Sequence, residues 1–205
     1  MLANRRRVIL GTAALLAAPG LARAALATPR QSAGPFYPLE LPLDHDNDLV
    51  HVAGRAEPAK GVIADLSGRL LDLSGRPLAG TRIEIWQCDA NGRYRHPRES
   101  GSKEIDAGFQ GFGRTVSDGE GRYRFLTIRP VPYPGRTPHI HVAVFPSGRE
   151  PFVTQLYVAG ESRNADDFLY RSIPVERRGL LTTPFEAGEA GAPLRARWDV
   201  VLDAV

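Results

Sequence analysis

Y-P-G-R-T-P-H-I-H-V, residues Tyr133 to Val142, brings a phenol, a guanidinium and two imidazoles together within nine residues. The β-branched Ile140 lies between the two histidines and the apolar run V-A-V-F follows, so this segment is predicted to be a strand. Because residues i and i+2 of a strand point to the same face, His139 and His141 should lie on one side, opposite Ile140 and Val142. Two neutral imidazoles side by side form half of a metal site. An H-x-H is also compatible with two solvent-facing histidines, so the surrounding sequence has to decide.

The composition is that of an ordinary globular domain, because 42% of the 205 residues are hydrophobic and 24% are charged. A chain of this length can bury a core without disulfide bonds. Cys88 is the single cysteine, so no disulfide can form within the chain, and we expect it to be a small buried residue. The 21 glycines and 17 prolines favour short strands joined by turns over long helices.

The positive charge of the chain is concentrated at its N-terminus. The formal net charge is +3, but residues 1–27 hold four arginines and no acidic residue. Without them, 22 basic residues face 23 acidic ones. The remainder contains no run of Lys or Arg interleaved with aromatic residues, so a nucleic-acid partner is not expected.

Residues 1–27 have the pattern of an export signal. Arg5-Arg6-Arg7 precedes an apolar run from Val8 to Ala18, and small residues follow that suit cleavage after Ala24 or Ala27. The apolar run is too short to span a bilayer comfortably, which predicts a cleaved signal and no membrane anchor in the mature protein. N-R-R-R-V-I-L resembles a twin-arginine signal, which exports folded proteins to the periplasm or the exterior. An ordinary secretory signal with a chance arginine pair is the alternative.

Segments rich in strand-forming residues and bounded by turns recur from Gly61 onward. The expected strands cover residues 62–73, 81–88, 114–117, 123–128, 139–145, 152–158 and 194–205, with a short helix over 164–170. The turn D-A-N-G at 89–92 is the strongest, because Asn-Gly tolerates positive φ, and it should carry residues 93–96 beyond a strand end. D-G-E-G at 118–121 predicts a hairpin. About seven to eight strands predict an all-β fold, a single-domain β-sandwich over residues 61–205.

Residues 28–60 are expected to form an extended N-terminal arm. The segment from Gln31 to Pro42 is rich in proline and aromatic residues and has no regular period. D-H-D-N-D at 44–48 lacks the glycine and the closing glutamate of a calcium loop, so we interpret it as a solvated polar loop. The sequence leaves open whether Gly34 to Tyr37 closes the pocket of its own chain or that of a neighbour in a homo-oligomer.

A metal held by two imidazoles alone is under-ligated, so other donors must exist. Tyr94, His96 and Tyr133 are the useful candidates among the tyrosines and histidines. His96 with His139 and His141 would make an open zinc or copper site. Tyr94 and Tyr133 with the two histidines would instead supply two phenolates, a set suited to a trivalent cation such as iron(III). The residue types alone leave both possibilities open.

Several ordered segments together resemble the intradiol ring-cleaving catechol dioxygenases, the family of protocatechuate 3,4-dioxygenase. The segments are Q-S-A-G-P-F-Y (31–37), I-E-I-W-Q-C-D-A-N-G-R-Y-R-H (83–96), F-Q-G-F-G-R-T (109–115), Y-R-F-L-T-I-R-P (123–130), Y-P-G-R-T-P-H-I-H (133–141) and T-Q-L-Y (154–157). They span most of residues 31–160. A two-part motif is far more specific than H-x-H alone: E-I-W-Q-x-D-A-x-G-x-Y followed by Y-P-x-R-x-x-H-x-H.

The resemblance implies a metal site residue by residue. It places the two tyrosine ligands of a non-haem iron(III) on Tyr94 and Tyr133, and the two histidine ligands on His139 and His141. His96 has no ligand role in the family pattern.

The resemblance also implies a substrate, a reaction and two further site residues. A catechol-type ring would chelate the iron, react with O2 and open between its hydroxylated carbons to a cis,cis-muconate-type dicarboxylic acid. Tyr133 would be displaced and take one substrate proton. Arg136 would stabilise negative charge on the ring, and Gln155 would line the same pocket. From the residues alone, Arg136 could instead form a surface salt bridge and Gln155 could be a polar group at a strand edge.

Two departures from the family pattern bear on the substrate. Val131 and Gly135 stand where relatives often have a glycine and a bulky residue, so Gly135 is expected to enlarge or reshape the pocket. An export signal is also unusual in this family and suggests extracellular catechols, plant phenolics or lignin fragments. The alternative functions are an exported transthyretin-like binding module and a zinc hydrolase using His96, His139 and His141.

Overall fold

The computed structural model describes residues 26–42 and 44–203, so residues 1–25 of the predicted export signal lie outside the described part. Among the described residues there are nine strands: β1 (Ile63–Asp72), β2 (Arg82–Trp86), β3 (Phe112–Val116), β4 (Arg122–Ile128), β5 (His139–Phe145), β6 (Phe152–Val158), β7 (Thr182–Thr183), β8 (Leu194–Arg197) and β9 (Val200–Leu202). Three short helices complete the described elements: η1 (Ser162–Ala165), α1 (Phe168–Arg171) and η2 (Val175–Leu181). Each of these helices is too short to cross a membrane.

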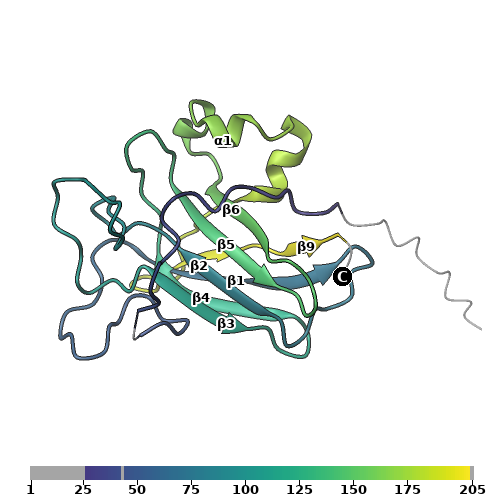
Figure 1. The fold of residues 1–205 in the computed structure, drawn as a ribbon, viewed down its shortest axis with the longest axis horizontal. Coiled ribbons are helices and arrows are strands. Elements are labelled where there is room, and N and C mark those ends of the chain that lie inside the picture. Colours follow the sequence, from purple (N-terminus) through teal and green to yellow (C-terminus); the bar gives the residue numbers. More distant parts are fainter. Residues whose placement is uncertain (1–25, 43, 204–205) are drawn as a thin grey trace, which may run out of the picture.

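The strands form two sheets that enclose the main core, which confirms the predicted β-sandwich (Figure 1). One sheet has the order β4-β1-β8, with β9 continuing along β1, and the other has the order β3-β2-β5-β6-β7. The pairs β1–β8, β1–β9 and β6–β7 are parallel, and the others are antiparallel. The strand count exceeds the expected one because the last predicted strand divides into β8 and β9 and because β7 is added.

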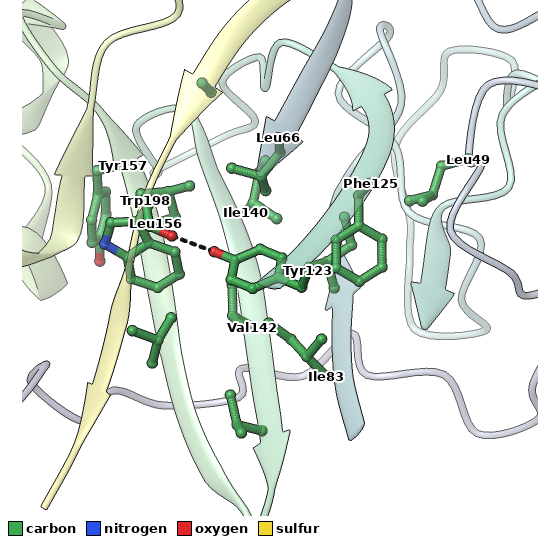
Figure 2. Packing of buried hydrophobic residues seen from close by; sticks show 14 of the residues in the cluster. Leu49, Leu66, Ile83, Tyr123, Phe125, Ile140, Val142, Leu156, Tyr157 and Trp198 are labelled. Atoms are coloured by element: carbon green, nitrogen blue, oxygen red, sulfur yellow. Dashed lines mark hydrogen bonds between the residues drawn. The ribbon is translucent and has the colours of Figure 1, made fainter. Parts of the chain in front are cut away.

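The last predicted strand divides where the backbone of Trp198 turns toward β1. The Tyr123 hydroxyl donates a hydrogen bond to the Trp198 carbonyl at 2.6 Å, as Figure 2 shows. A Cβ atom on Gly68 would lie 1.7 Å from the same carbonyl oxygen, so only glycine permits this approach. Tyr123 is therefore a core residue that anchors the C-terminal strands.

The predicted hairpin around residues 118–121 is wrong. β3 pairs with β2 in one sheet and β4 pairs with β1 in the other, so the turn between β3 and β4 carries the chain across the sandwich. Asp118 does form the expected turn, because its carboxylate accepts the backbone N–H groups of Glu120 and Arg122. Turn chemistry determines that the chain reverses, whereas burial of the strand faces decides which strands pair.

The predicted helix over 164–170 is also divided in the structure. Asp167 has an extended backbone, with φ −76° and ψ 121°, and its carboxylate accepts the N–H groups of Leu169 and Tyr170. The preceding η1 ends at Ala165 with Asp166 as its C-cap, and Asp167 caps α1, since aspartate is a favoured N-cap residue.

The alternation of histidines and apolar residues along β5 places them on opposite faces of the sheet, as expected. Ile140 and Val142 join the core between the sheets, where Figure 2 shows them beside Leu66 and Leu156. The histidines of β5 therefore lie on the outer face of the five-stranded sheet. That face is buried too, because the arm runs along β6, where Gln31 N donates to Val153 O at 2.9 Å.

Neither Cys88 nor the polar loop at 44–48 belongs to a metal-binding cluster among the described residues. Cys88 is buried, as expected, and burial raises the pKa of its thiol to about 12. In the loop at 44–48, Asp44 and Asp48 accept the backbone N–H groups of Ala53 and Val50. These carboxylates shape the loop.

Candidate metal centre

The two histidines of β5 meet at their outer nitrogens. The Nε2 atoms of His139 and His141 are 3.2 Å apart, and both side chains are buried. His139 Nδ1 lies 2.6 Å from the Thr137 carbonyl, to which it must donate a proton. This hydrogen bond leaves the lone pair on His139 Nε2 directed at His141. The His141 ring is held by stacking on the Trp86 indole, with ring centroids 4.9 Å apart and planes 5° from parallel.

Both imidazoles are neutral at ordinary pH. Burial lowers the pKa of His139 to about 3, with the nearby Arg136 adding to the effect. Burial also holds the pKa of His141 well below its usual value, with His139 and Arg136 contributing. Two nitrogens that each lie about 2.1 Å from one metal ion at about a right angle are about 3 Å apart. The imidazole pair therefore fits adjacent positions on one metal ion.

Tyr94 and Tyr133 complete the group of four side chains. Their rings are 5.4 Å apart, Tyr133 lies 5.4 Å from the His139 ring, and Tyr94 lies 6.2 Å from the His141 ring. The Tyr94 hydroxyl is buried and has no hydrogen-bond partner among the described residues. A buried hydroxyl without a partner is costly in a folded protein, and a metal ion would satisfy it.

Burial raises the pKa of both phenols. For Tyr94 the neighbouring Cys88 and Tyr133 add to this effect, whereas for Tyr133 the positive charge of Arg136 opposes it. Without a metal both phenols are protonated. A strongly charged cation would be required to hold them as phenolates, since a bound cation dominates the local electrostatics.

Two turns place the tyrosines. The Asp89 carboxylate accepts the N–H groups of Asn91 and Arg93, which closes the D-A-N-G turn and presents Tyr94 after it. The Tyr133 carbonyl accepts the N–H of Arg136 at 3.0 Å, which closes a second turn directly before β5. Both turns are short-range features that the sequence shows.

Arg136 is buried, with 8% of its side chain exposed, and its three nitrogens have different partners. Nε donates to Asp167 Oδ2 at 2.7 Å and Nη2 donates to Gln155 Oε1 at 2.6 Å. Nη1 lies 3.3 Å from the Tyr133 hydroxyl and 3.4 Å from His139 Nε2. The protein therefore holds two edges of the guanidinium and directs the third nitrogen at the proposed metal ligands. This arrangement is no surface salt bridge.

Gln155 links Arg136 to the N-terminal arm. It lies on β6, between β5 and β7, and is fully buried, so it is not at a sheet edge. Its Nε2 donates to the Ser32 carbonyl at 2.8 Å. The hydroxyl of Tyr157 lies 3.1 Å from the same Oε1 that accepts from Arg136.

Asp167 is the site residue that the sequence reasoning missed. Its carboxylate is completely buried and accepts N–H groups from Thr137, Leu169 and Tyr170 in addition to Arg136. Burial alone would raise the pKa of Asp167, but the hydrogen bonds from Arg136 and the backbone lower it below its usual value. Asp167 lies in the middle of the helix predicted over 164–170, so the sequence did not indicate that it caps α1. Nothing local in the sequence indicates its pairing with Arg136.

His96 does not join the other two histidines. It is buried against Phe36, with ring centroids 5.7 Å apart, and its Nδ1 accepts the backbone N–H of Arg98. The described residues contain no group of three His, Cys, Asp or Glu side chains arranged to hold a metal ion. The zinc site proposed from His96, His139 and His141 is therefore wrong, because His96 lies on a loop beyond Tyr94.

The segment from Gly34 to Tyr37 closes the site of its own chain. Phe36 stacks on Tyr94 with ring centroids 4.5 Å apart, and the Tyr37 hydroxyl donates to Glu84 at 2.8 Å. A Cβ atom on Gly34 would lie 3.2 Å from His141 Cε1, and Gly34 has a φ of +66°, so glycine suits this position in two ways. The arm thus packs against Tyr94, Tyr133 and His141.

The fold and the site together define a β-sandwich protein with two phenols and two imidazoles, three of them buried and Tyr133 half-buried, in a set suited to one metal ion. A family model described as Dioxygenase matches residues 32–204. The chain belongs to this family, the intradiol dioxygenases. It is therefore an oxidoreductase of the ring-cleaving class, and the alternative of a non-catalytic binding module is not supported.

Individual relatives agree with this assignment. The chain is 38% identical over 172 residues to the protocatechuate 3,4-dioxygenase beta chain of Burkholderia cepacia, covering 78% of this chain and 72% of that protein. It is 29% identical to catechol 1,2-dioxygenase of Acinetobacter baylyi, covering 78% of this chain but 54% of the longer relative. The chain thus spans about half the length of that relative.

Solved structures show the same fold. The dioxygenase domain of a dioxygenase and carbohydrate-binding protein fusion from Streptomyces sp. SirexAA-E is 31% identical, with a TM-score of 0.66, covering 87% of this chain and 99% of that one. The intradiol ring-cleavage dioxygenase from Tetranychus urticae has a TM-score of 0.70 and covers 87% of this chain and 95% of that one. At 19% identity the second comparison supports the fold alone.

Proposed function

We propose that the protein is a non-haem iron(III) dioxygenase that opens a catechol-type ring with O2 to a cis,cis-muconate-type dicarboxylic acid. The observation that carries this proposal is the convergence of Tyr94, Tyr133, His139 and His141. Both imidazoles are neutral, and the Tyr94 hydroxyl has no hydrogen-bond partner within residues 26–42 and 44–203. Relatives named for protocatechuate, catechol and hydroxyquinol support the substrate class.

Iron(III) fits these residues better than zinc or copper. Two phenols whose pKa values are raised by burial ionise only next to a strongly charged cation, and hard oxygen donors suit a trivalent one. Tyr94, Tyr133, His139 and His141 would hold it. When bound, ferric iron supplies the Lewis acidity that allows a catechol to bind through two deprotonated oxygens.

The two tyrosines have different roles in this proposal. Tyr94 is buried beneath Phe36 and stays in place. Tyr133 is half-buried and borders an open chamber, so it has room to move. As a phenolate, its oxygen would accept one of the two catechol protons, and Arg136 Nη1 lies 3.3 Å from that oxygen.

Arg136 acts on the charge of the bound ring. Its guanidinium is fixed by Asp167 and Gln155, so Nη1 stays directed at the reaction space without reorganisation. Fixed donors of this kind stabilise developing negative charge because they are already oriented before the reaction. Phe36 and Gly34 pack against Tyr94 and His141, on the side of the site that the arm covers.

A visible absorption spectrum with metal analysis tests the proposal directly. The purified protein is expected to hold about one iron per chain and to show a broad tyrosinate-to-iron(III) band, which shifts when catechol is added without oxygen. The shift reports direct chelation of the substrate. A protein that stays colourless after reconstitution with iron would contradict the proposed metal and the proposed reaction together.

We also propose that the protein is exported to the periplasm or the exterior by the twin-arginine route. The support is the N-R-R-R-V-I-L sequence and the short apolar run that follows it. Replacement of Arg5, Arg6 and Arg7 by lysine keeps the charge and should leave the protein in the cytoplasm. N-terminal sequencing of exported protein should find cleavage after Ala24 or Ala27. Unchanged export of the lysine variant would favour an ordinary secretory signal.

A further inference from the structure

A large chamber opens beside the two site residues Tyr133 and Arg136. Its volume is about 870 Å³, and three stretches of chain line it: residues 91–103, 132–137 and 163–167. A cavity of about 150 Å³ is enough for one benzene ring. The chamber is several times larger than a bare catechol requires, and it lies within the range of about 300–1,000 Å³ that holds drug-sized ligands.

The walls of this chamber leave the space open. Gly135 lies between Tyr133 and Arg136, and a Cβ atom built on it would meet nothing within 4 Å. Ser100 and Ser102 are small and exposed in the loop that forms another wall. No bulky side chain at these positions limits the length of a ligand whose ring is held at the metal ligands.

The chamber is rich in hydrogen-bond donors. Arg93 is held by Glu99, with 3.3 Å between nitrogen and oxygen, and by the Lys103 carbonyl. The side chains of Lys103 and Arg163 also line the chamber, and neither has a carboxylate partner among the described residues. Of the three carboxylates that line the chamber, Glu99 pairs with Arg93 and Asp167 pairs with Arg136. Asp166 alone has no cationic partner among the described residues. Donors outnumber acceptors, so the lining suits a group that carries oxygen acceptors.

We propose that this chamber is a subsite for a large, oxygen-rich substituent on the catechol ring, so that the preferred substrate is an extended catechol such as a dihydroxycinnamoyl ester. The ring would lie at Tyr133 and Arg136, and the substituent would extend past Gly135 toward Lys103 and Arg163. The inference rests on the proposed function and adds the class of substrate to it.

The test compares catechol with a dihydroxycinnamoyl ester of quinate as substrates of the iron-loaded protein. Wild-type protein is expected to show a kcat/KM for the ester at least equal to that for catechol. Ser102→Trp fills the chamber away from the metal ligands and should lower kcat/KM for the ester by about tenfold or more, with that for catechol changed by less than about twofold. Ser147→Trp, in the exposed turn between β5 and β6 and outside the chamber, is the matched control and should change neither value.

The outcomes distinguish failure of the proposed subsite from failure of the proposed function. A wild-type protein that cleaves catechol but rejects the ester overturns the subsite and leaves the proposed function standing. Equal losses for both substrates in Ser102→Trp also overturn it. If Ser102→Trp does not retain iron, Ser100→Trp asks the same question from the neighbouring position in the loop. Absence of both iron and catechol turnover in wild-type protein contradicts the proposed function instead.

Discussion

Replacing His141 with glutamine is expected to remove bound iron and to reduce ring cleavage to below about 1% of the wild-type rate. Lewis-acid activation is worth several kcal/mol, and about 2.7 kcal/mol already corresponds to a hundredfold change in rate. His141 Nε2 lies 3.2 Å from His139 Nε2, and glutamine cannot reproduce this pair of neutral imidazoles. The measurement is iron content and the tyrosinate-to-iron(III) band, followed by turnover of catechol.

His96→Gln is the matched control for this experiment, because His96 is a second buried histidine of the same region. It lies against Phe36 and away from the β5 histidines, so the control should keep its iron and its colour. Loss of metal in His96→Gln with retention in His141→Gln would reverse the assignment of the ligands.

Arg136→Ala is expected to lower kcat for catechol by about a hundredfold, with a smaller change in KM. Removing one preorganised donor to a developing negative charge costs about 10²–10³ in kcat. Asp167→Asn should lower kcat by about tenfold, because Asp167 touches Arg136 and acts through it. Iron content and the anaerobic shift on catechol binding should stay close to wild type in both variants.

A variant that combines Arg136→Ala with Asp167→Asn tests whether Asp167 acts on kcat by positioning Arg136 or by stabilising the fold. If Asp167 works by orienting Arg136, its effect on kcat should nearly disappear in the Arg136→Ala background. Asp65→Asn is a control that breaks another Asp–Arg pair, the one between Asp65 and Arg124 on the β1–β4 surface, and it should leave kcat unchanged. Additive losses in kcat in the Asp167 and Arg136 variants would assign Asp167 a purely structural role.

Much of the site follows from local sequence. The alternation of His139 and His141 with Ile140 and Val142 determines which face each side chain takes, because the period of a strand is two. The turn before Tyr94 follows from Asn91-Gly92, since glycine accepts the positive φ of 77° found there. Such features depend on neighbours in the chain, so they could be predicted without the fold.

The partners of Arg136 could not be predicted in this way. Arg136 and Asp167 are 31 positions apart, and their contact depends on where α1 packs against β6. The approach of Gly34 to His141 likewise requires the arm to run along the finished sheet. No local pattern encodes a distance between segments that meet only after the sandwich has formed.

The sequence by itself determined the strand character of β5, the shared face of its two histidines, the turn that presents Tyr94 and the family to which the chain belongs. Only the tertiary structure decided that β3 and β4 belong to different sheets, that His96 stays apart from the other histidines and that Asp167 holds Arg136. The physical reason is the range of the forces involved. Backbone sterics and strand period act between neighbours, whereas strand pairing and buried ion pairs depend on the joint burial of residues far apart in the chain.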